Sequence, residues 1–151
     1  EVLEQAFYVL FVPAEAAPEV DFERDYDPSL PSFRGDADRL LQLLLNLLRN
    51  AMQASARRIG LRSRAERGVM LNEQPVRLAI RFDVIDDGAG VPTALRDSLF
   101  LPLVSGRADG SGLGLALAQE IAQEHAGHLG YTSRPGRTVF SLTLPLEPLH
   151  G

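Results

Sequence analysis

Two asparagines, Asn46 and Asn50, lie one helical turn apart inside a leucine-rich run, residues 36–56. At about 100° per residue, the polar side chains of this run point into one narrow sector of a helix, and apolar side chains fill nearly all the rest. A solvated helix face is the simpler interpretation, but such faces usually carry Glu and Lys, whereas Asn is a poor helix former. Because buried amides need hydrogen-bonding partners, we predict a polar cavity or a ligand at this seam. The seam consists of Arg39, Gln42, Asn46, Arg49, Asn50 and Gln53.

Glycines form a second cluster, since six of the 13 lie between positions 88 and 114. Closely spaced glycines before a helix let backbone N–H groups approach a phosphate at the positive end of that helix. The run 110–114 therefore favours a phosphate-binding loop, while ordinary turns are an equal alternative for Gly88 and Gly90. The run is no Walker loop because no Gly-Lys-Ser/Thr follows, and Leu115 stands where a dinucleotide fingerprint has its third glycine.

Asp86 ends an apolar strand pattern two residues before Gly88. An aspartate at this point can simply cap the turn. The alternative is a carboxylate at the floor of a pocket, where it accepts a hydrogen bond from an exocyclic amine such as that of adenine. We favour the pocket, and we interpret the neighbouring Asp87 as a solvated turn residue.

The elements that must position these residues follow from the apolar periodicity. Alternation predicts strands at 19–26, 58–64, 76–86, 128–134 and 137–145, the second and third joined by a loop at 68–75. Asp36 is the expected N-cap of the helix over 36–56, and Gly127 the expected C-cap of a helix over 113–127. Shorter helices are expected at 1–12 and 95–103. This mixture predicts an α+β two-layer sandwich, with helices on one face of a mixed, largely antiparallel sheet.

Composition narrows the class of protein. The 151 residues are enough for one domain with a real core, and the net charge of −5 gives no basic footprint for nucleic acid or for an anionic membrane surface. No apolar run approaches the ~18 residues of a membrane span. The chain has no cysteine, which excludes disulfides and thiolate zinc sites.

Five motifs follow one another along the chain: NLLRNA at 46–51, DDGAGVP at 86–92, LFLPLVSG at 99–106, GSGLGLALAQEIAQEHAG at 110–127 and GRTVFSLTLPL at 136–146. Their order and spacing resemble the sequence boxes of sensor histidine kinases. The chain therefore resembles the ATP-binding catalytic domain of these kinases, the Bergerat or GHKL fold, over roughly residues 19–147. More narrowly, RDYDPSLP, NAMQA and the glycine-rich run resemble the NtrB subfamily of nitrogen-regulation kinases.

The resemblance implies two cofactors, ATP and Mg²⁺, and a role for individual residues. Asn50 would coordinate Mg²⁺, Asn46 would face the phosphates, and both would serve catalysis. Asp86 would accept from the adenine amino group, Thr138 would support it, and Phe100 would anchor a lid at 104–111. The implied nucleotide-binding residues are Asn46, Asn50, Asp86, Gly88, Gly90, Arg107, Gly110, Ser111, Gly112, Leu113, Gly114 and Thr138.

One departure from the family pattern concerns charge near the phosphates. Gln53 stands where many relatives have a basic or aromatic residue, and Arg107 or Arg49 is the candidate replacement. The three histidines, His125, His128 and His150, lack the sequence context of the family's phosphoacceptor. We therefore expect residues 1–18 to connect to a dimerisation and phosphoacceptor domain absent from this chain, residues 19–147 to bind ATP, and 148–151 to be a tail.

The implied function is transfer of the ATP γ-phosphoryl group to a histidine of that separate domain, in the cytoplasm, with no nucleic acid or membrane partner. An NtrC-type response regulator and a PII-type signalling protein are the implied partners. Three alternatives stay open. A GHKL ATPase has a general-base Glu where this chain has Asn46, and a serine kinase of the anti-sigma type also tends to keep that acidic residue. A non-catalytic nucleotide-sensing module is the third.

Overall fold

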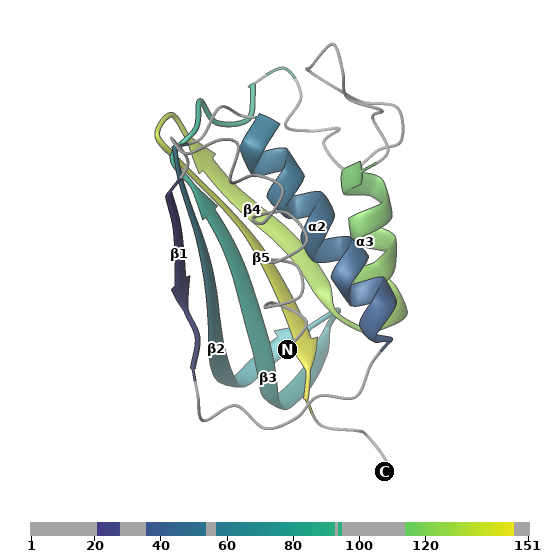
Figure 1. Cartoon of the computed structure of the whole chain (residues 1–151). Helices are drawn as coiled ribbons and strands as arrows, with labels where there is room; N and C mark the ends of the chain where they lie inside the picture. The colour runs from purple at the N-terminus through teal and green to yellow at the C-terminus, as the bar shows by residue number, and fades with distance from the viewer. Residues whose placement is uncertain (1–20, 28–35, 54–56, 93, 95–113, 147–151) are drawn as a thin grey trace.

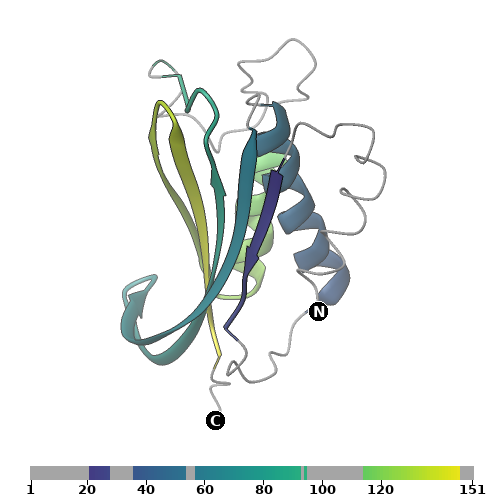
Figure 2. The same ribbon diagram turned by 60° about the vertical axis from the view of Figure 1, so that its left-hand side comes forward.

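The computed structural model describes residues 21–27, 36–53, 57–92, 94 and 114–146. Their elements are β1 (Asp21–Asp25), α2 (Ala37–Gln53), β2 (Arg58–Leu71), β3 (Gln74–Asp86), α3 (Gly114–Glu124), β4 (His128–Arg134) and β5 (Arg137–Pro145). The strands form one sheet in the order β1-β2-β3-β5-β4, with β1 parallel to β2 and the other pairs antiparallel. Both helices lie on one face of the sheet (Figure 1, Figure 2). The predicted two-layer α+β fold is confirmed.

Helix α2 begins where the sequence predicts. The backbone N–H of Arg39 donates to Asp36 Oδ1 at 3.1 Å, which makes Asp36 the N-cap. The Arg39 guanidinium also reaches α3, where its Nε donates to Glu124 Oε1 at 3.1 Å and this hydrogen bond lowers the pKa of Glu124. The helix packs its leucines on the sheet, because removing that apolar surface from water stabilises the fold. The most buried of them are Leu43, Leu44, Leu47 and Leu48.

The hairpin of β2 and β3 differs from the prediction. The expected loop at 68–75 is wrong, because both strands continue through it to a two-residue turn at Asn72 and Glu73. These two residues have φ angles of 51° and 68°, the left-handed conformation of a tight hairpin turn that Asn tolerates. Pro75 is compatible with β3 because β5 pairs with β3 only over residues 79–86, which leaves Pro75 a partner on one side alone.

The end of α3 also corrects the prediction. Ala126, with φ at 57°, takes the left-handed position that was expected for Gly127. The N–H of Gly127 donates to the Ala122 carbonyl and that of Ala126 to the Gln123 carbonyl, which is the Schellman pattern. Glycine is required at 127 for a different reason, since a Cβ there would lie 2.5 Å from the Thr143 carbonyl oxygen. The glycine permits the close packing of the helix end on β5.

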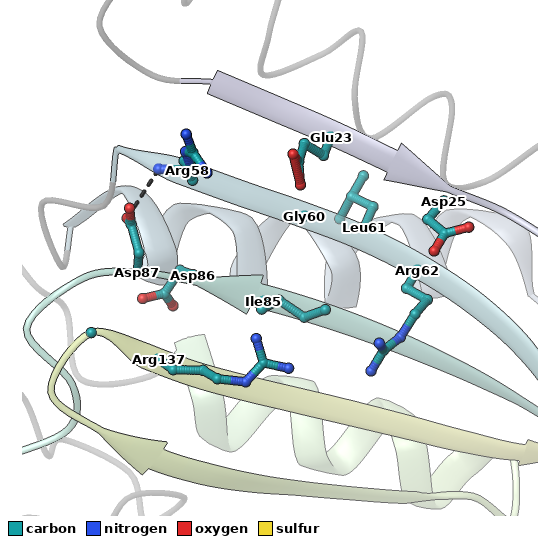
Figure 3. Close-up of a pocket in the computed structure, with 11 residues that line it drawn as sticks. Glu23, Asp25, Arg58, Gly60, Leu61, Arg62, Ile85, Asp86, Asp87 and Arg137 are labelled. Atoms are coloured by element: carbon teal, nitrogen blue, oxygen red, sulfur yellow. Dashed lines mark hydrogen bonds between the residues drawn. The ribbon is translucent and has the colours of Figure 1, made fainter.

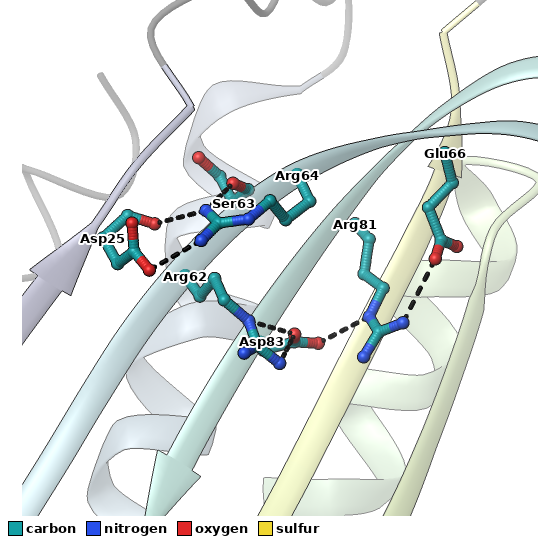
Figure 4. Close-up of polar contacts among 7 residues, drawn as sticks. All are labelled: Asp25, Arg62, Ser63, Arg64, Glu66, Arg81 and Asp83. Atoms are coloured by element: carbon teal, nitrogen blue, oxygen red, sulfur yellow. Dashed lines mark hydrogen bonds and ion pairs between the residues drawn. The ribbon is translucent and has the colours of Figure 1, made fainter.

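The face of the sheet that the helices leave uncovered carries a chain of charges (Figure 4). Arg62 Nη2 lies 2.7 Å from Asp83 Oδ2, Arg81 Nε lies 3.0 Å from Asp83 Oδ1, and Arg81 continues to Glu66 at 3.1 Å. The pKa of Asp83 is set by two opposing effects. Burial of this side chain, which is 1% exposed, acts to raise the pKa, but the hydrogen bonds from Arg81, Ser141 and Arg62 together outweigh burial. The pKa of Asp83 therefore lies below its ordinary value.

Several predicted segments lie outside the described residues: the connector 1–18, the helices at 1–12 and 95–103, the lid 104–111 with Phe100 and Arg107, and the tail 148–151. Residues 54–56, the end of the helix predicted over 36–56, also lie outside the described residues. Neither α2 nor α3 is long and apolar enough to cross a membrane.

Candidate functional site

Four residues form a row across one end of the sheet, on the face that the helices cover. Ile59 of β2, Asp86 of β3, Thr138 of β5 and Ser133 of β4 are successive cross-strand partners. Asp86 is 3% exposed and Thr138 is 2% exposed. The next row into the core consists of Leu61, Val84, Phe140 and Tyr131, so the polar row lies directly on an apolar one.

The buried Asp86 has a fixed orientation. Its Oδ1 accepts the backbone N–H of Gly88 at 2.9 Å, which folds the chain back directly after β3. A carboxylate in such a place is costly unless hydrogen bonds or charges compensate for lost water. Asp86 therefore caps the turn after β3, and its burial at the end of the apolar core is equally compatible with the pocket interpretation.

The loop that follows Asp86 is fastened to the turn between β4 and β5. The N–H of Gly136 donates to the Gly88 carbonyl at 3.0 Å, and the N–H of Val91 donates to Ser133 Oγ at 2.8 Å. Gly90 has a φ of 91°, and a Cβ on it would lie 3.1 Å from the Arg134 carbonyl oxygen. The close approach at Gly90 is therefore one of loop to hairpin, and it requires glycine for both conformation and space.

Helix α2 carries the two asparagines in its carboxyl-terminal half. Asn46 and Asn50 are half-buried, whereas Gln42 and Arg49 are exposed. The carboxyl end of α2, the end of β3 and the beginning of α3 at Gly114 all lie at the upper end in Figure 1. A buried carboxylate, two amides and the positive end of a helix are groups that suit an amine-bearing base with phosphates.

Asp87 has a role that the sequence prediction missed. It is exposed, as expected of a solvated turn residue, but its Oδ1 accepts the backbone N–H groups of Arg57 at 2.8 Å and Arg58 at 3.0 Å. The hydrogen bond from Arg58 is the main reason why the pKa of Asp87 lies below its ordinary value. Asp87 therefore holds the start of β2 against the end of β3, a contact that nothing in the local sequence indicates.

A hollow of about 340 Å³ lies over β1, β2, β3 and the β4–β5 turn (Figure 3). Charges of both signs line it, including Glu23, Asp25, Arg58 and Arg137. Gly60 forms part of its floor on the face that the helices leave uncovered, because buried Ile59 and Leu61 on either side point into the core. Asp86 also borders this hollow, although its cross-strand row with Ile59 and Thr138 faces the helices. The sequence analysis did not predict the hollow.

Metal ligands can be assessed in the same residues. Across 21–27, 36–53, 57–92, 94 and 114–146 there is no group of three or more His, Cys, Asp or Glu side chains that could hold an ion. An oxygen-preferring ion bound there by an amide would need oxygens from a bound molecule as well.

A known protein family matches most of the chain. The family model described as "Histidine kinase-, DNA gyrase B-, and HSP90-like ATPase" matches residues 35–148. The chain belongs to this family. Strand β1 precedes the matched region, yet all five of its residues pair with β2, so β1 belongs to the same sheet as the matched residues.

Two relatives carry the name "Sensory histidine kinase/phosphatase NtrB". The protein of Proteus hauseri is 46% identical over 136 residues, which are 88% of this chain and 39% of the relative. The protein of Klebsiella oxytoca is 45% identical over 142 residues, or 92% and 41%. The ATPase-family domain described here thus spans about two fifths of the length of these relatives.

Solved structures support the same assignment. The catalytic domain of the histidine kinase ThkA superposes with a TM-score of 0.78 at 25% identity, covering 96% of this chain and 90% of that one. Full-length ShkA in complex with AMPPNP also superposes with a TM-score of 0.78, at 26% identity, covering 99% of this chain and 30% of that one. The ATPase-family domain therefore has the fold of histidine kinase catalytic domains.

The structure describes only some of the predicted site residues. Asp86 and Thr138 are cross-strand partners, and Gly88 and Gly90 lie in the loop that follows Asp86. Asn46 and Asn50 lie in the carboxyl-terminal half of α2, and Gly114 begins α3. Arg107, Gly110, Ser111, Gly112 and Leu113 lie outside the described residues, as does the side chain of Gln53. Ser133 was missed: alternation over 128–134 places it on the face of Leu129, but only the pairing of β4 with β5 brings it opposite Thr138.

Proposed function

We propose that this chain is the catalytic domain of a sensor histidine kinase, which binds Mg·ATP and transfers the γ-phosphoryl group to a histidine of a separate dimerisation domain. The observation that carries the proposal is Asp86, a buried carboxylate oriented by Gly88 N–H at the open end of an apolar core. Such a carboxylate suits a base with an exocyclic amine, and the ShkA structure with AMPPNP supports an adenine nucleotide in this fold.

Each residue then has a part in binding. Asp86 accepts from the adenine amino group, with Thr138 beside it, and the loop of Gly88 and Gly90 passes the base. Asn46 faces the phosphates and Asn50 holds Mg²⁺ through its amide oxygen. We extend the phosphate site to Arg107 and to Gly110, Ser111, Gly112, Leu113 and Gly114, where the positive end of α3 favours an anion.

Bound Mg²⁺ would neutralise charge on the phosphates during transfer. The bond between the γ-phosphorus and its bridging oxygen breaks, a new bond forms to an imidazole nitrogen, and ADP leaves. The protein contributes position more than acid or base chemistry. His125 is engaged structurally, because its Nε2 accepts the Asp36 N–H at 3.1 Å and its Nδ1 donates to the Ile121 carbonyl at 2.9 Å. A histidine of another domain is therefore the proposed acceptor.

The identity to NtrB proteins supports a role in nitrogen regulation. An NtrC-type response regulator is the proposed phosphoryl acceptor downstream, and a PII-type signalling protein the proposed regulator. The names of the relatives include a phosphatase, so we propose that the full protein also removes phosphate from the regulator. We further propose that it works in the cytoplasm.

The test is transfer of label from γ-labelled Mg·ATP to a separately made, histidine-bearing helical hairpin of the Klebsiella oxytoca relative, with free phosphate followed in the same tube. Labelled hairpin with little free phosphate is the expected result. Asn50→Ala should lower labelling on the order of 100-fold, since several kcal/mol of charge neutralisation depend on the metal. Gln42→Ala, an exposed change on the same helix, is the matched control. Free phosphate without labelled hairpin would identify a hydrolase instead.

A further inference from the structure

Ser133 lies beside the proposed adenine site without belonging to it. It is half-buried near the end of β4, on the covered face, and is the cross-strand partner of Thr138. Its Oγ lies 2.8 Å from Val91 N and 2.8 Å from Thr138 Oγ1. One small side chain thus touches both the loop after β3 and the threonine next to Asp86.

These two contacts complete the fastening of the loop. Asp86 Oδ1 holds the loop at Gly88 N–H, Gly136 N–H holds it at the Gly88 carbonyl, and Ser133 Oγ holds its far end at Val91 N–H. Of these contacts, the one to Ser133 also links the loop to Thr138. A shift of Ser133 would therefore move the loop and Thr138 together relative to the carboxylate.

The space around Ser133 favours a hydroxyl. The position that a Cβ on Gly90 would take lies 3.2 Å from Ser133 Oγ, so the loop packs directly on this oxygen. Alanine at 133 would remove the hydrogen bond from the Val91 N–H, and losing a hydrogen bond in a half-buried place is unfavourable. Threonine would keep the hydroxyl and suits a strand.

We propose that Ser133 is a positioning residue for recognition of the adenine 6-amino group. It acts through Thr138 and the Val91 end of the loop, which hold Asp86 at the distance and angle that a hydrogen bond from the amine requires. The inference rests on the proposed function, since it assumes an adenine nucleotide beside Asp86. It predicts that Ser133 sets selectivity for the base rather than affinity for the triphosphate.

The test compares binding of ATP and of purine riboside triphosphate, which lacks the 6-amino group, by calorimetry on the whole chain. The native chain should prefer ATP at least about tenfold, the size of one well-placed hydrogen bond. In Ser133→Ala the affinity for ATP should fall about tenfold while that for the analogue stays within about twofold. Ser133→Thr should retain the preference, and Thr132→Ala, an exposed change on the same strand, should have no effect.

Coupling gives a second readout. In a Thr138→Val background, Ser133→Ala should cause little further loss of ATP affinity, because contacting residues that act together are non-additive. Ser133→Cys, with a weak hydrogen-bonding thiol of similar size, replaces the alanine variant if that variant does not fold. Equal losses for ATP and the analogue, or an unchanged preference, would overturn the role of Ser133. A native chain that binds neither nucleotide would overturn the proposed function itself.

Discussion

Asp86 lies at the end of an apolar core with only 3% of its surface exposed, and its Oδ1 accepts a hydrogen bond from the Gly88 N–H. At the scale of single residues this is the feature that most constrains the ligand. An amide side chain could keep the contact to Gly88, because it also has an acceptor oxygen, but it would carry no charge toward the proposed adenine base. A substitution at this position can therefore separate the effect on nucleotide affinity from the effect on the stability of the fold.

Asp86→Asn should weaken ATP binding by about 2–3 kcal/mol, the range for a hydrogen bond to a charged group. The free energy of unfolding without nucleotide should change by less than about 1 kcal/mol, since the Gly88 contact is retained. Titration calorimetry and urea unfolding measure the two quantities. Asp87→Asn is the control, because its side chain is exposed and faces Arg57 and Arg58. If affinity is retained in Asp86→Asn, the carboxylate only caps the turn.

The types and positions of the residues were enough to select Asp86, Asn46 and Asn50 as candidates. Asparagines inside a helix and a carboxylate at the end of an apolar strand are unfavourable unless they have partners. Ser133 and the structural contact of Asp87 depend on which strands lie side by side. Their partners, Thr138 and Arg58, come from other strands, and no local pattern carries that pairing.

At the scale of elements, the uncovered face of the sheet depends on one carboxylate between two arginines. Asp83→Asn should lower the free energy of unfolding by about 3 kcal/mol, because both guanidinium groups lose a nearly buried partner. Asp25→Asn removes only the exposed pair with Arg64 and should change it by less than about 1 kcal/mol. Urea unfolding at neutral pH distinguishes the two. Equal small effects would mean that the arginines find other partners.

The same carboxylate predicts a dependence on pH. The folded pKa of Asp83 lies below its ordinary value of 3.8, so its stabilisation is complete above the unfolded pKa and is lost as the pH falls through the folded pKa. The native chain should therefore lose stability below about pH 5, and Asp83→Asn should lose less over the same range. Parallel curves for the two proteins would assign the acid sensitivity to other groups.

The end of α3 offers two neighbouring changes with opposite signs. Ala126→Gly should raise the free energy of unfolding by about 0.5–1 kcal/mol, because alanine is strained at a φ of 57°. Gly127→Ala should lower it by at least about 2 kcal/mol, because the new Cβ would meet the Thr143 carbonyl and Leu144. Thermal and urea unfolding measure both. Sequence patterns predicted a glycine-dependent helix end here but not which residue turns the chain.

For the whole molecule, periodicity predicted α2, α3 and the five strands, and the mixture of elements predicted helices on one face of the sheet. It could not predict that β1 runs parallel to β2 or that β5 lies between β3 and β4. These pairings depend on contacts between distant parts of the chain. The strands of the β2–β3 hairpin were predicted too short, because Gly68 and Pro75 are typical of loops. Only the pairing of β2 with β3 shows that both strands continue past these residues.

The strand order has a consequence for how the domain folds. The two hairpins, β2–β3 and β4–β5, each close a turn of two residues, whereas β1 meets β2 only across the whole of α2. Short loops close at a lower entropic cost than long ones. We therefore expect Ser133 and Thr138 to meet within the β4–β5 hairpin, and Asp86 to join them when the two hairpins pair. Asn46 and Asn50 belong to a helix outside both hairpins, so the proposed base-binding and phosphate-binding halves of the site should form in different steps of folding.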